Sequence, residues 1–206
     1  MTDIETLERA LRAAAQAHDD AALPDLIGPA DDRRLLDLAY ATLDSPVGTL
    51  LLAVTARGLV RIAYLGPEDE QSVLDELATA ISPRVLAAPR KLDSPRRELD
   101  EYFAGTRRRF EFPLDWRLTR GFGRRVLQAT ARIPYGTVST YKQMAGEAGS
   151  PRGSRAAGNA LGANPLPIVV PCHRVVHADG GLGGYTGGAE RKKVLLAVER
   201  GERAPQ

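Results

Sequence analysis

The chain contains a single cysteine, Cys172, and its neighbours are residues that could make a thiol reactive. An apolar run, Ile168-Val169-Val170, leads into Pro171-Cys172-His173-Arg174. A histidine and an arginine beside a thiol favour the thiolate, which is the nucleophilic form of cysteine. Lone cysteines are more often buried structural residues, so two interpretations stay open at this point: a nucleophile or a core thiol.

A nucleophilic cysteine needs a base, and His173 is the adjacent candidate. In an extended strand successive side chains point to opposite faces, so Cys172 and His173 can cooperate only if the chain turns there or if a water molecule bridges them. Glu199 could orient the imidazole, because Lys192, Leu196 and Glu199 share one face of a C-terminal helix. An exposed helix charge is the alternative interpretation of Glu199.

Length and composition limit the class of protein. The chain has 206 residues, of which 43% are hydrophobic and 26% are charged, as is ordinary for one or two small globular domains. No apolar run approaches the roughly 18 residues of a membrane span, and the first residues show no secretory signal. A single cysteine excludes an internal disulfide and a cysteine-based zinc site. We expect a soluble cytoplasmic protein that uses no metal and no cofactor.

Charge is distributed unevenly along the chain. From Thr119 onward there are 13 Lys and Arg against 5 Asp and Glu, whereas the first 118 residues hold 15 basic and 21 acidic residues. This asymmetry favours a C-terminal part that binds a polyanion. A solvated basic surface without a partner is the alternative.

The first 118 residues predict a small sheet with helices. Two β segments flank Asp44-Ser45-Pro46-Val47-Gly48, whose turn-forming residues predict a hairpin. Val60, Ile62 and Tyr64 alternate along a third strand, and residues 109–116 alternate as a strand or extended connector with one buried face. The expected elements are a helix over 1–18, a linker over 19–37, strands over 39–43, 49–55 and 59–65, and helices over 69–81 and 95–104.

Beyond Thr119 the sequence predicts short helices. One spans 122–130, and Thr140-Tyr141-Lys142-Gln143 is a capping-box sequence that opens the next. Ser150 is a candidate N-cap, with Pro151 as the first residue of a third helix that runs to about Gly162. Two short helices joined by a glycine-containing turn predict a helix-turn-helix.

Several blocks of the sequence, in order, resemble the O6-alkylguanine-DNA alkyltransferases, also called methylated-DNA–protein-cysteine S-methyltransferases. Pro171–Val175 carries the resemblance at the cysteine, and further matching blocks lie at 133–141, 155–158, 162–165, 184–188 and 195–199. The similarity is strong over 119–201 and weaker over 38–118, where Leu43–Gly48 matches. Residues 1–37 have no counterpart.

The resemblance implies a mixed α/β (α+β) fold. A small β-sheet domain with helices would occupy 38–118, and a winged helix-turn-helix-like domain for DNA binding and alkyl acceptance would occupy 119–206, after an N-terminal extension over 1–37. It also implies a reaction in which a thiolate attacks the alkyl carbon on guanine O6, so that each molecule acts once. The expected partner is double-stranded DNA containing O6-alkylguanine, with O4-alkylthymine as a further candidate. The protein is expected to be a monomer, and cooperative binding along DNA is left open.

The resemblance assigns catalytic roles to five residues. Cys172 would accept the alkyl group, His173 would take its proton through water, and Glu199 would orient His173. Tyr141 would donate a hydrogen bond to guanine N3, and Asn164 would fix the turn at the active site.

Other residues would bind the flipped base and the DNA. Arg155 would insert into the base stack and hold the nucleotide outside the duplex. The small residues that follow it, Ala156, Ala157 and Gly158, would allow close approach to the minor groove. Substrate contacts are also expected from the amide of Thr186, the carbonyls of Cys172 and Val175, and the residues Tyr185 and Lys192.

Two other functions stay open. A non-catalytic DNA binder would use the helix-turn-helix alone, but alkyltransferase-like proteins of that kind lack the cysteine. A cysteine hydrolase would use Cys172 and His173, but the sequence offers no oxyanion-hole motif and no well-placed separate histidine. His177 is expected to be a surface residue without a role.

Overall fold

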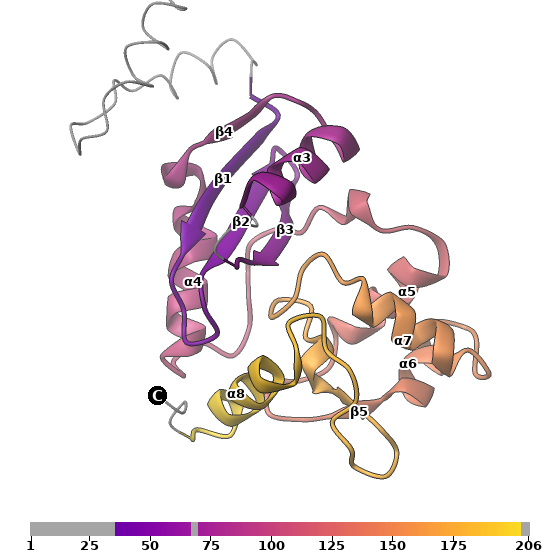
Figure 1. Ribbon diagram of the computed structural model, residues 1–206. Helices are drawn as coiled ribbons and strands as arrows, with labels where there is room; N and C mark the ends of the chain where they lie inside the picture. Colours follow the sequence, from indigo (N-terminus) through magenta and orange to yellow (C-terminus); the bar gives the residue numbers. More distant parts are fainter. Residues whose placement is uncertain (1–35, 67–69, 203–206) are drawn as a thin grey trace, which may run out of the picture. The chain divides into compact units, whose positions relative to one another are not determined.

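The structure is a computed structural model that describes residues 36–66 and 70–202. The expected helix over 1–18 and nearly all of the expected linker over 19–37 lie outside these residues. The expected mixed α/β fold is confirmed: a small sheet with helices is followed by a group of short helices (Figure 1). From Asp37 onward the residues form one compact unit, and the boundary expected between 118 and 119 stays a prediction. Within the described ranges, no helix is long and apolar enough to cross a membrane.

The sheet has four strands in the order β3-β2-β1-β4. The strands are β1 (Leu38–Leu43), β2 (Leu50–Thr55), β3 (Gly58–Tyr64) and β4 (Val85–Ala87). The first three pair antiparallel, and β4 pairs parallel to β1. The expected hairpin is confirmed: Gly48 N donates to Ser45 O at 2.9 Å, and Gly48 has a φ of 96°, which glycine adopts without strain.

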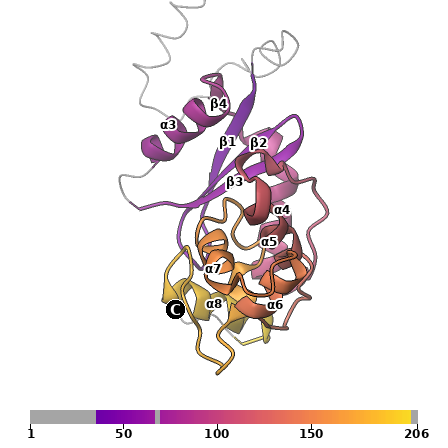
Figure 2. The ribbon, with the colours of Figure 1, turned by 90° about the vertical axis from the view of Figure 1, so that its right-hand side faces the viewer.

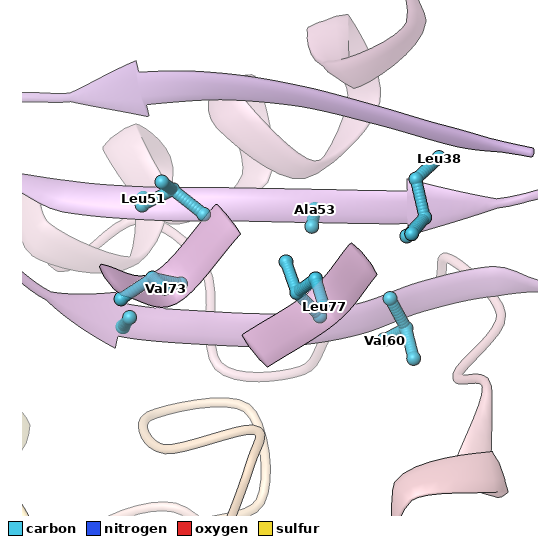
Figure 3. Packing of buried hydrophobic residues seen from close by; sticks show 7 residues of the cluster. Leu38, Leu51, Ala53, Val60, Val73 and Leu77 are labelled. Atoms are coloured by element: carbon cyan, nitrogen blue, oxygen red, sulfur yellow. The ribbon is translucent and has the colours of Figure 1, made fainter. Parts of the chain in front are cut away.

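Helix α3 (Glu70–Ala80) covers one face of the sheet. Its buried residues Val73 and Leu77 face Leu51, Ala53 and Val60 on the strands (Figure 3). Burying a side chain such as Leu77 contributes about 1.5–3 kcal/mol to folding. This cluster fixes the sheet as the scaffold on which the later elements pack.

A β-bulge in the pairing of β2 with β3 decides which way the β3 side chains point. Val60 and Ala63 both lie in the cluster under α3, so Tyr64, next to Ala63, points to the opposite face. There its hydroxyl meets that of Tyr185 at 2.5 Å. The regular alternation expected from Val60 through Ile62 to Tyr64 is therefore wrong, because one extra residue in β3 shifts the two-residue period.

Helix α4 (Asp93–Phe103) lies on the other side of the sheet from α3 (Figure 2). It begins two residues before the expected start and buries Leu99 and Tyr102. The sequence predicts neither β4 nor the short 3-10 helix η1 (Pro89–Leu92), since segments of three or four residues carry too little periodicity. Tyr102 is the residue through which α4 reaches the functional site.

Residues 109–116 are an extended connector rather than a strand. The connector touches the sheet through an isolated bridge between Leu59 and Leu114. Asp115 alternates with Leu114 and Trp116, a pattern that places it on the exposed face, but it is only 3% exposed. Its carboxylate accepts a hydrogen bond from Thr55 Oγ1 at 2.7 Å and caps the 3-10 helix η2 (Trp116–Leu118), which explains why a charge can lie inside.

The C-terminal part consists of short helices around a helix-turn-helix. The helices are α5 (Gly121–Thr130), α6 (Tyr141–Glu147), α7 (Ser154–Gly162) and α8 (Ala189–Glu199). The expected capping box is confirmed, with Thr140 Oγ1 accepting from Gln143 N at 3.2 Å and Gln143 Oε1 accepting from Thr140 N at 2.8 Å. Helix α7 starts three residues later than expected, because Ser150 O accepts from Gly153 N within the preceding turn and Gly153 is the N-cap.

Two very short strands connect the helix-turn-helix to the cysteine segment. Strand β5 (Ser139–Thr140) directly precedes α6, and β6 (Val175–Val176) directly follows the Cys172 turn. They pair in parallel, with Ser139 opposite Val175. The pairing ties the start of α6 to the segment that carries the thiol, although two-residue strands leave no pattern in the sequence.

Gly58 gives a test of the junction between the sheet and the connector. Its φ is 127°, and a Cβ atom there would overlap the backbone carbonyl of Pro113. We expect Gly58→Ala to lower the free energy of unfolding by about 3 kcal/mol or more, because backbone strain and overlap add. Urea denaturation measures the loss. Gly105→Ala is the control, since Gly105 has a φ of 74° with no atom within 4 Å; equal losses in both variants would contradict the importance of the Pro113 contact.

Candidate active site

The chain turns at the cysteine, as cooperation between Cys172 and His173 requires. Cys172–Arg174 form a 3-10 turn, η3, directly after Pro171. Upstream, Ile168 adopts a φ of 74°, a left-handed conformation that is uncommon for a β-branched residue. Both side chains are buried, with Cys172 4% exposed and His173 fully inside.

Asn164 holds this turn in place. Its Nδ2 donates to Val170 O at 2.9 Å and lies 3.1 Å from the sulfur of Cys172. Its Oδ1 accepts from Leu166 N at 3.0 Å. Asn164 thereby links the segment before the turn to the thiol. It is one of the residues to which the sequence assigned a role.

Cys172 carries a proton in this environment. Burial raises the pKa of its thiol to about 11, although the hydrogen bond from Asn164 and the charge of Lys192 act in the opposite direction. The expectation that Arg174 favours the thiolate is wrong. Its guanidinium instead donates hydrogen bonds to the carboxylate of Glu199 and to Ile133 O. These contacts hold the charge of Arg174 beside Glu199.

His173 and Glu199 form a buried pair. His173 Nε2 lies 2.7 Å from Glu199 Oε1. Because a carboxylate only accepts, the neutral imidazole carries its proton on Nε2, and Nδ1 is left as an acceptor. Nδ1 has no hydrogen-bond partner among the described residues. Burial lowers the pKa of His173, which keeps the ring neutral and able to take a proton.

Glu199 is not an exposed helix charge but the centre of a buried network. Besides His173, its carboxylate accepts from Arg174 Nη2 at 2.8 Å, Tyr102 Oη at 2.8 Å and Gly136 N at 3.1 Å. Burial alone would raise its pKa, but hydrogen bonds and charge from His173 and Arg174 hold the pKa of Glu199 at about 2. Glu199 therefore stays ionised. In residues 36–66 and 70–202, no group of His, Cys, Asp and Glu is placed to hold a metal ion.

Lys192 does not lie where it could touch DNA, contrary to expectation. It is fully buried, and its Nζ donates to Val175 O at 2.6 Å and to Leu182 O. It thereby joins β6 to the glycine-rich segment that follows. Its positive charge favours the thiolate of Cys172, the effect that the sequence argument attributed to Arg174.

A cavity of about 740 Å³ opens between α7 and the glycine-rich segment. This volume is within the roughly 300–1,000 Å³ typical of small-molecule sites. The expected substrate residues that line it are Tyr141, Arg155, Gly158, Tyr185 and Thr186. The structure thus brings five of the expected residues together around one opening.

Only some of the α7 residues that were expected to approach DNA are exposed. Arg155 and Ala156 are exposed, whereas Ala157 is fully buried. Arg155, Ala156 and Ala157 together span about 200° around the helix axis, so all three cannot face outward, and Ala157 is the one that is buried. The expectation that Ala157 lies against DNA is therefore wrong, because its side chain packs inside the protein. Gly158 lies close to the ring of Tyr141, which a Cβ atom would meet at 3.7 Å.

Several residues that surround the site carry no recognisable signal in the sequence. Tyr64 and Tyr102 come from the sheet half of the chain, more than 90 residues from their partners Tyr185 and Glu199. No local pattern could have indicated these contacts. His177 is exposed as expected, yet its ring lies 5.1 Å from that of Tyr141 and lines the cavity. Its position five residues after the cysteine was the available signal.

Two domain families match the chain. Residues 38–116 match the ribonuclease-like domain of 6-O-methylguanine DNA methyltransferase, and residues 121–201 match the DNA binding domain of the same protein. Together they cover the sheet and the helix-turn-helix with its cysteine. Both halves of the chain therefore match domains of the same protein family.

Curated relatives and solved structures agree. A methylated-DNA–protein-cysteine methyltransferase of Mycolicibacterium paratuberculosis is 40% identical over 163 residues, which is 79% of this chain and 93% of the relative. The constitutive enzyme of Bacillus subtilis is 39% identical over 162 residues, covering 78% and 94%. Mycobacterium tuberculosis OGT in complex with DNA superimposes with a TM-score of 0.67 at 37% identity, covering 81% of this chain and 95% of that one. The chain belongs to the 6-O-methylguanine DNA methyltransferase family.

Proposed function

We propose that this chain repairs DNA by transferring an alkyl group from O6 of guanine to the sulfur of Cys172, once per molecule. Family membership and the relatives' names support DNA repair by alkyl transfer to a cysteine. One observation carries the assignment. The buried Cys172 is next in sequence to His173, whose Nε2 lies 2.7 Å from the carboxylate of Glu199. Cys172 is the sole cysteine of the sequence, so no other thiol is available.

The first step moves the thiol proton, because a pKa of about 11 leaves little thiolate at neutral pH. The unpartnered Nδ1 of His173 takes this proton through a water molecule, and the ionised Glu199 stabilises the resulting imidazolium. The sulfur then attacks the alkyl carbon, so that an S–C bond forms while the C–O6 bond breaks. Guanine leaves with the electron pair and takes up a proton. Nothing in these steps regenerates the thiol.

Tyr141 assists the departure of guanine. Burial raises the pKa of its hydroxyl, so the group keeps its proton and can donate to guanine N3. The amide of Thr186 contacts O6, and the carbonyls of Cys172 and Val175 accept from the exocyclic amine. Val175 O already accepts from Lys192, but a carbonyl has two lone pairs and can accept twice.

The base must leave the duplex to reach the sulfur. Arg155 is exposed on α7 at the rim of the cavity, where it can enter the base stack and hold the nucleotide outside the helix. Ala156 beside it presents little bulk to the minor groove. O4-alkylthymine, which also carries its alkyl group on an exocyclic oxygen, is a second candidate substrate. The protein would act as a monomer, since every group in the mechanism comes from one chain, and in the cytoplasm, where a thiol stays reduced.

Replacement of the acceptor separates transfer from binding. We expect Cys172→Ser to abolish transfer from a duplex carrying labelled O6-methylguanine, because the hydroxyl is a far weaker nucleophile, while affinity for the duplex is retained. Wild-type protein should take up one label per molecule, located on Cys172 by mass spectrometry. Many turnovers per molecule would instead favour a hydrolase, and loss of DNA affinity in the variant would mean that the thiol is structural.

The pH dependence of transfer tests the proton path. The single-turnover rate constant is expected to be nearly constant from about pH 7 to 9, since the thiol and the imidazole both keep their protonation state there. It should fall only at a pH below the ordinary histidine pKa of about 6.5, because burial lowers the pKa of His173 and the ring must be neutral to act as a base. Iodoacetamide alkylation of the urea-unfolded protein is the control, and its rate should rise through the ordinary thiol pKa of about 8.5. A tenfold rise per pH unit in the transfer rate would refute the His173 path.

Arg155 can be tested by comparing duplex DNA with a free base. Arg155→Ala is expected to slow transfer from duplex by roughly 100-fold, in line with an unstacking cost of a few kcal/mol, and to leave reaction with free O6-benzylguanine unchanged. Arg152→Ala is the matched control, because Arg152 is also exposed but lies in the turn before α7 and does not line the cavity. Equal slowing of both reactions by Arg155→Ala would remove its role in base flipping.

A further inference from the structure

Two tyrosines from distant parts of the chain meet beside the active site. The hydroxyls of Tyr64 and Tyr185 are 2.5 Å apart, and their rings pack edge to face with centroids 6.2 Å apart. Tyr64 ends β3 in the sheet, and Tyr185 lies in the glycine-rich segment after the cysteine. Burial raises the pKa of both hydroxyls, so one of the two protonated groups donates to the other.

Arg191 completes this cluster from the start of α8. Its guanidinium lies 4.8 Å from the centroid of the Tyr64 ring, a cation–π contact. Nε donates to Val47 O in the β1–β2 turn at 2.7 Å, and Nη1 donates to Gly187 O at 3.1 Å. Arg191 therefore holds the sheet and the segment of Tyr185 together. We call Tyr64, Tyr185 and Arg191 the tyrosine clamp.

The packing within the clamp is close. A Cβ atom at Gly187 would lie 2.6 Å from Tyr64 and 2.9 Å from Tyr185, so only glycine fits between the two rings. The segment around Tyr185 is otherwise rich in residues with large backbone freedom, namely Gly180, Gly181, Gly183, Gly184 and Gly188. The ring of Tyr185 therefore depends on contacts from outside its own segment for a fixed position.

Tyr185 borders both the cavity and the proton relay. It lines the cavity of about 740 Å³ together with Tyr141 and Arg155. Its ring packs edge to face against His173 with centroids 6.3 Å apart. A shift of this ring changes the wall of the cavity and the packing against His173, while the thiol, the imidazole and the carboxylate all remain in the protein.

Resting on the proposed function, we infer that Tyr64 is a positioning residue that sets which alkyl groups the site accepts. It holds the ring of Tyr185 against the active site, so that the space next to Cys172 suits a small O6 substituent. Without the Tyr64 hydroxyl the Tyr185 ring loses its fixed partner and can withdraw, and a larger substituent fits. The sheet half of the chain thereby contributes to substrate selection through a single hydroxyl.

The test measures single-turnover transfer from two duplexes of the same sequence, one carrying O6-methylguanine and one carrying O6-benzylguanine. For Tyr64→Phe we expect the ratio of the benzyl rate to the methyl rate to rise about fivefold, the effect of losing one hydrogen bond of ordinary net strength. Tyr40→Phe is the matched control, since Tyr40 lies on β1 within the sheet packing under α3, and its ratio should stay at the wild-type value. Thermal unfolding of each variant confirms that it is folded.

A double-mutant cycle isolates the pair. If the two hydroxyls act only through each other, Tyr185→Phe alone and the double variant shift the ratio as far as Tyr64→Phe does. An unchanged or lower ratio for folded Tyr64→Phe overturns the inference, as do additive effects of the two substitutions. Transfer by wild-type protein from neither duplex would overturn the proposed function itself, so the two failures are distinct.

Discussion

The carboxylate of Glu199 is a negative charge inside the protein, and the surrounding structure is arranged to accommodate it. An unpaired buried carboxylate costs several kcal/mol, which proteins avoid by supplying partners. Here the donors come from three separate parts of the chain: Tyr102 on α4, Gly136 in the loop before β5, and His173 with Arg174 in the turn η3. Losing one partner of such a buried group typically costs about 3–5 kcal/mol. The buried charge therefore has all of its partners only when both halves of the chain are folded together.

The same burial determines the character of the thiol. Cys172 is held neutral by desolvation, and the positive charge of Lys192 only partly offsets that effect. In the proposed mechanism the sulfur becomes nucleophilic only when its proton passes to His173, which itself stays neutral because burial lowers its pKa. In this state the acceptor is protonated and only 4% exposed, so it reacts slowly with electrophiles in solution.

The sheet half of the chain does more than support the helices. Tyr102 reaches Glu199, and Tyr64 reaches Tyr185, so both halves supply polar groups to the region around one sulfur. The register of β3 makes the second contact available. Ala63 pairs with Leu51 and both lie in the cluster under α3, so Tyr64, which pairs with Leu50, points to the opposite face of the sheet.

Local interactions explain what could be predicted from the sequence. The hairpin at Asp44–Gly48 and the capping box at Thr140 depend on residues within a few positions of one another, so their patterns are visible in the chain. The need for a turn at Cys172 and His173 also follows from local geometry. The buried Asp115, the orientation of Ala157 and the bulge depend on partners elsewhere, and there the local patterns mislead.

The sequence by itself determined which groups are chemically able to act: one thiol, an adjacent imidazole and a carboxylate on the last helix. Tertiary structure alone decided their states. It made the thiol neutral, the imidazole a proton acceptor and the carboxylate a buried anion, and it committed Arg174 to Glu199 and Lys192 to backbone carbonyls. The physical reason is that the free energy of a charge depends on desolvation and on nearby dipoles, and both come from whatever folds over the group rather than from its neighbours along the chain.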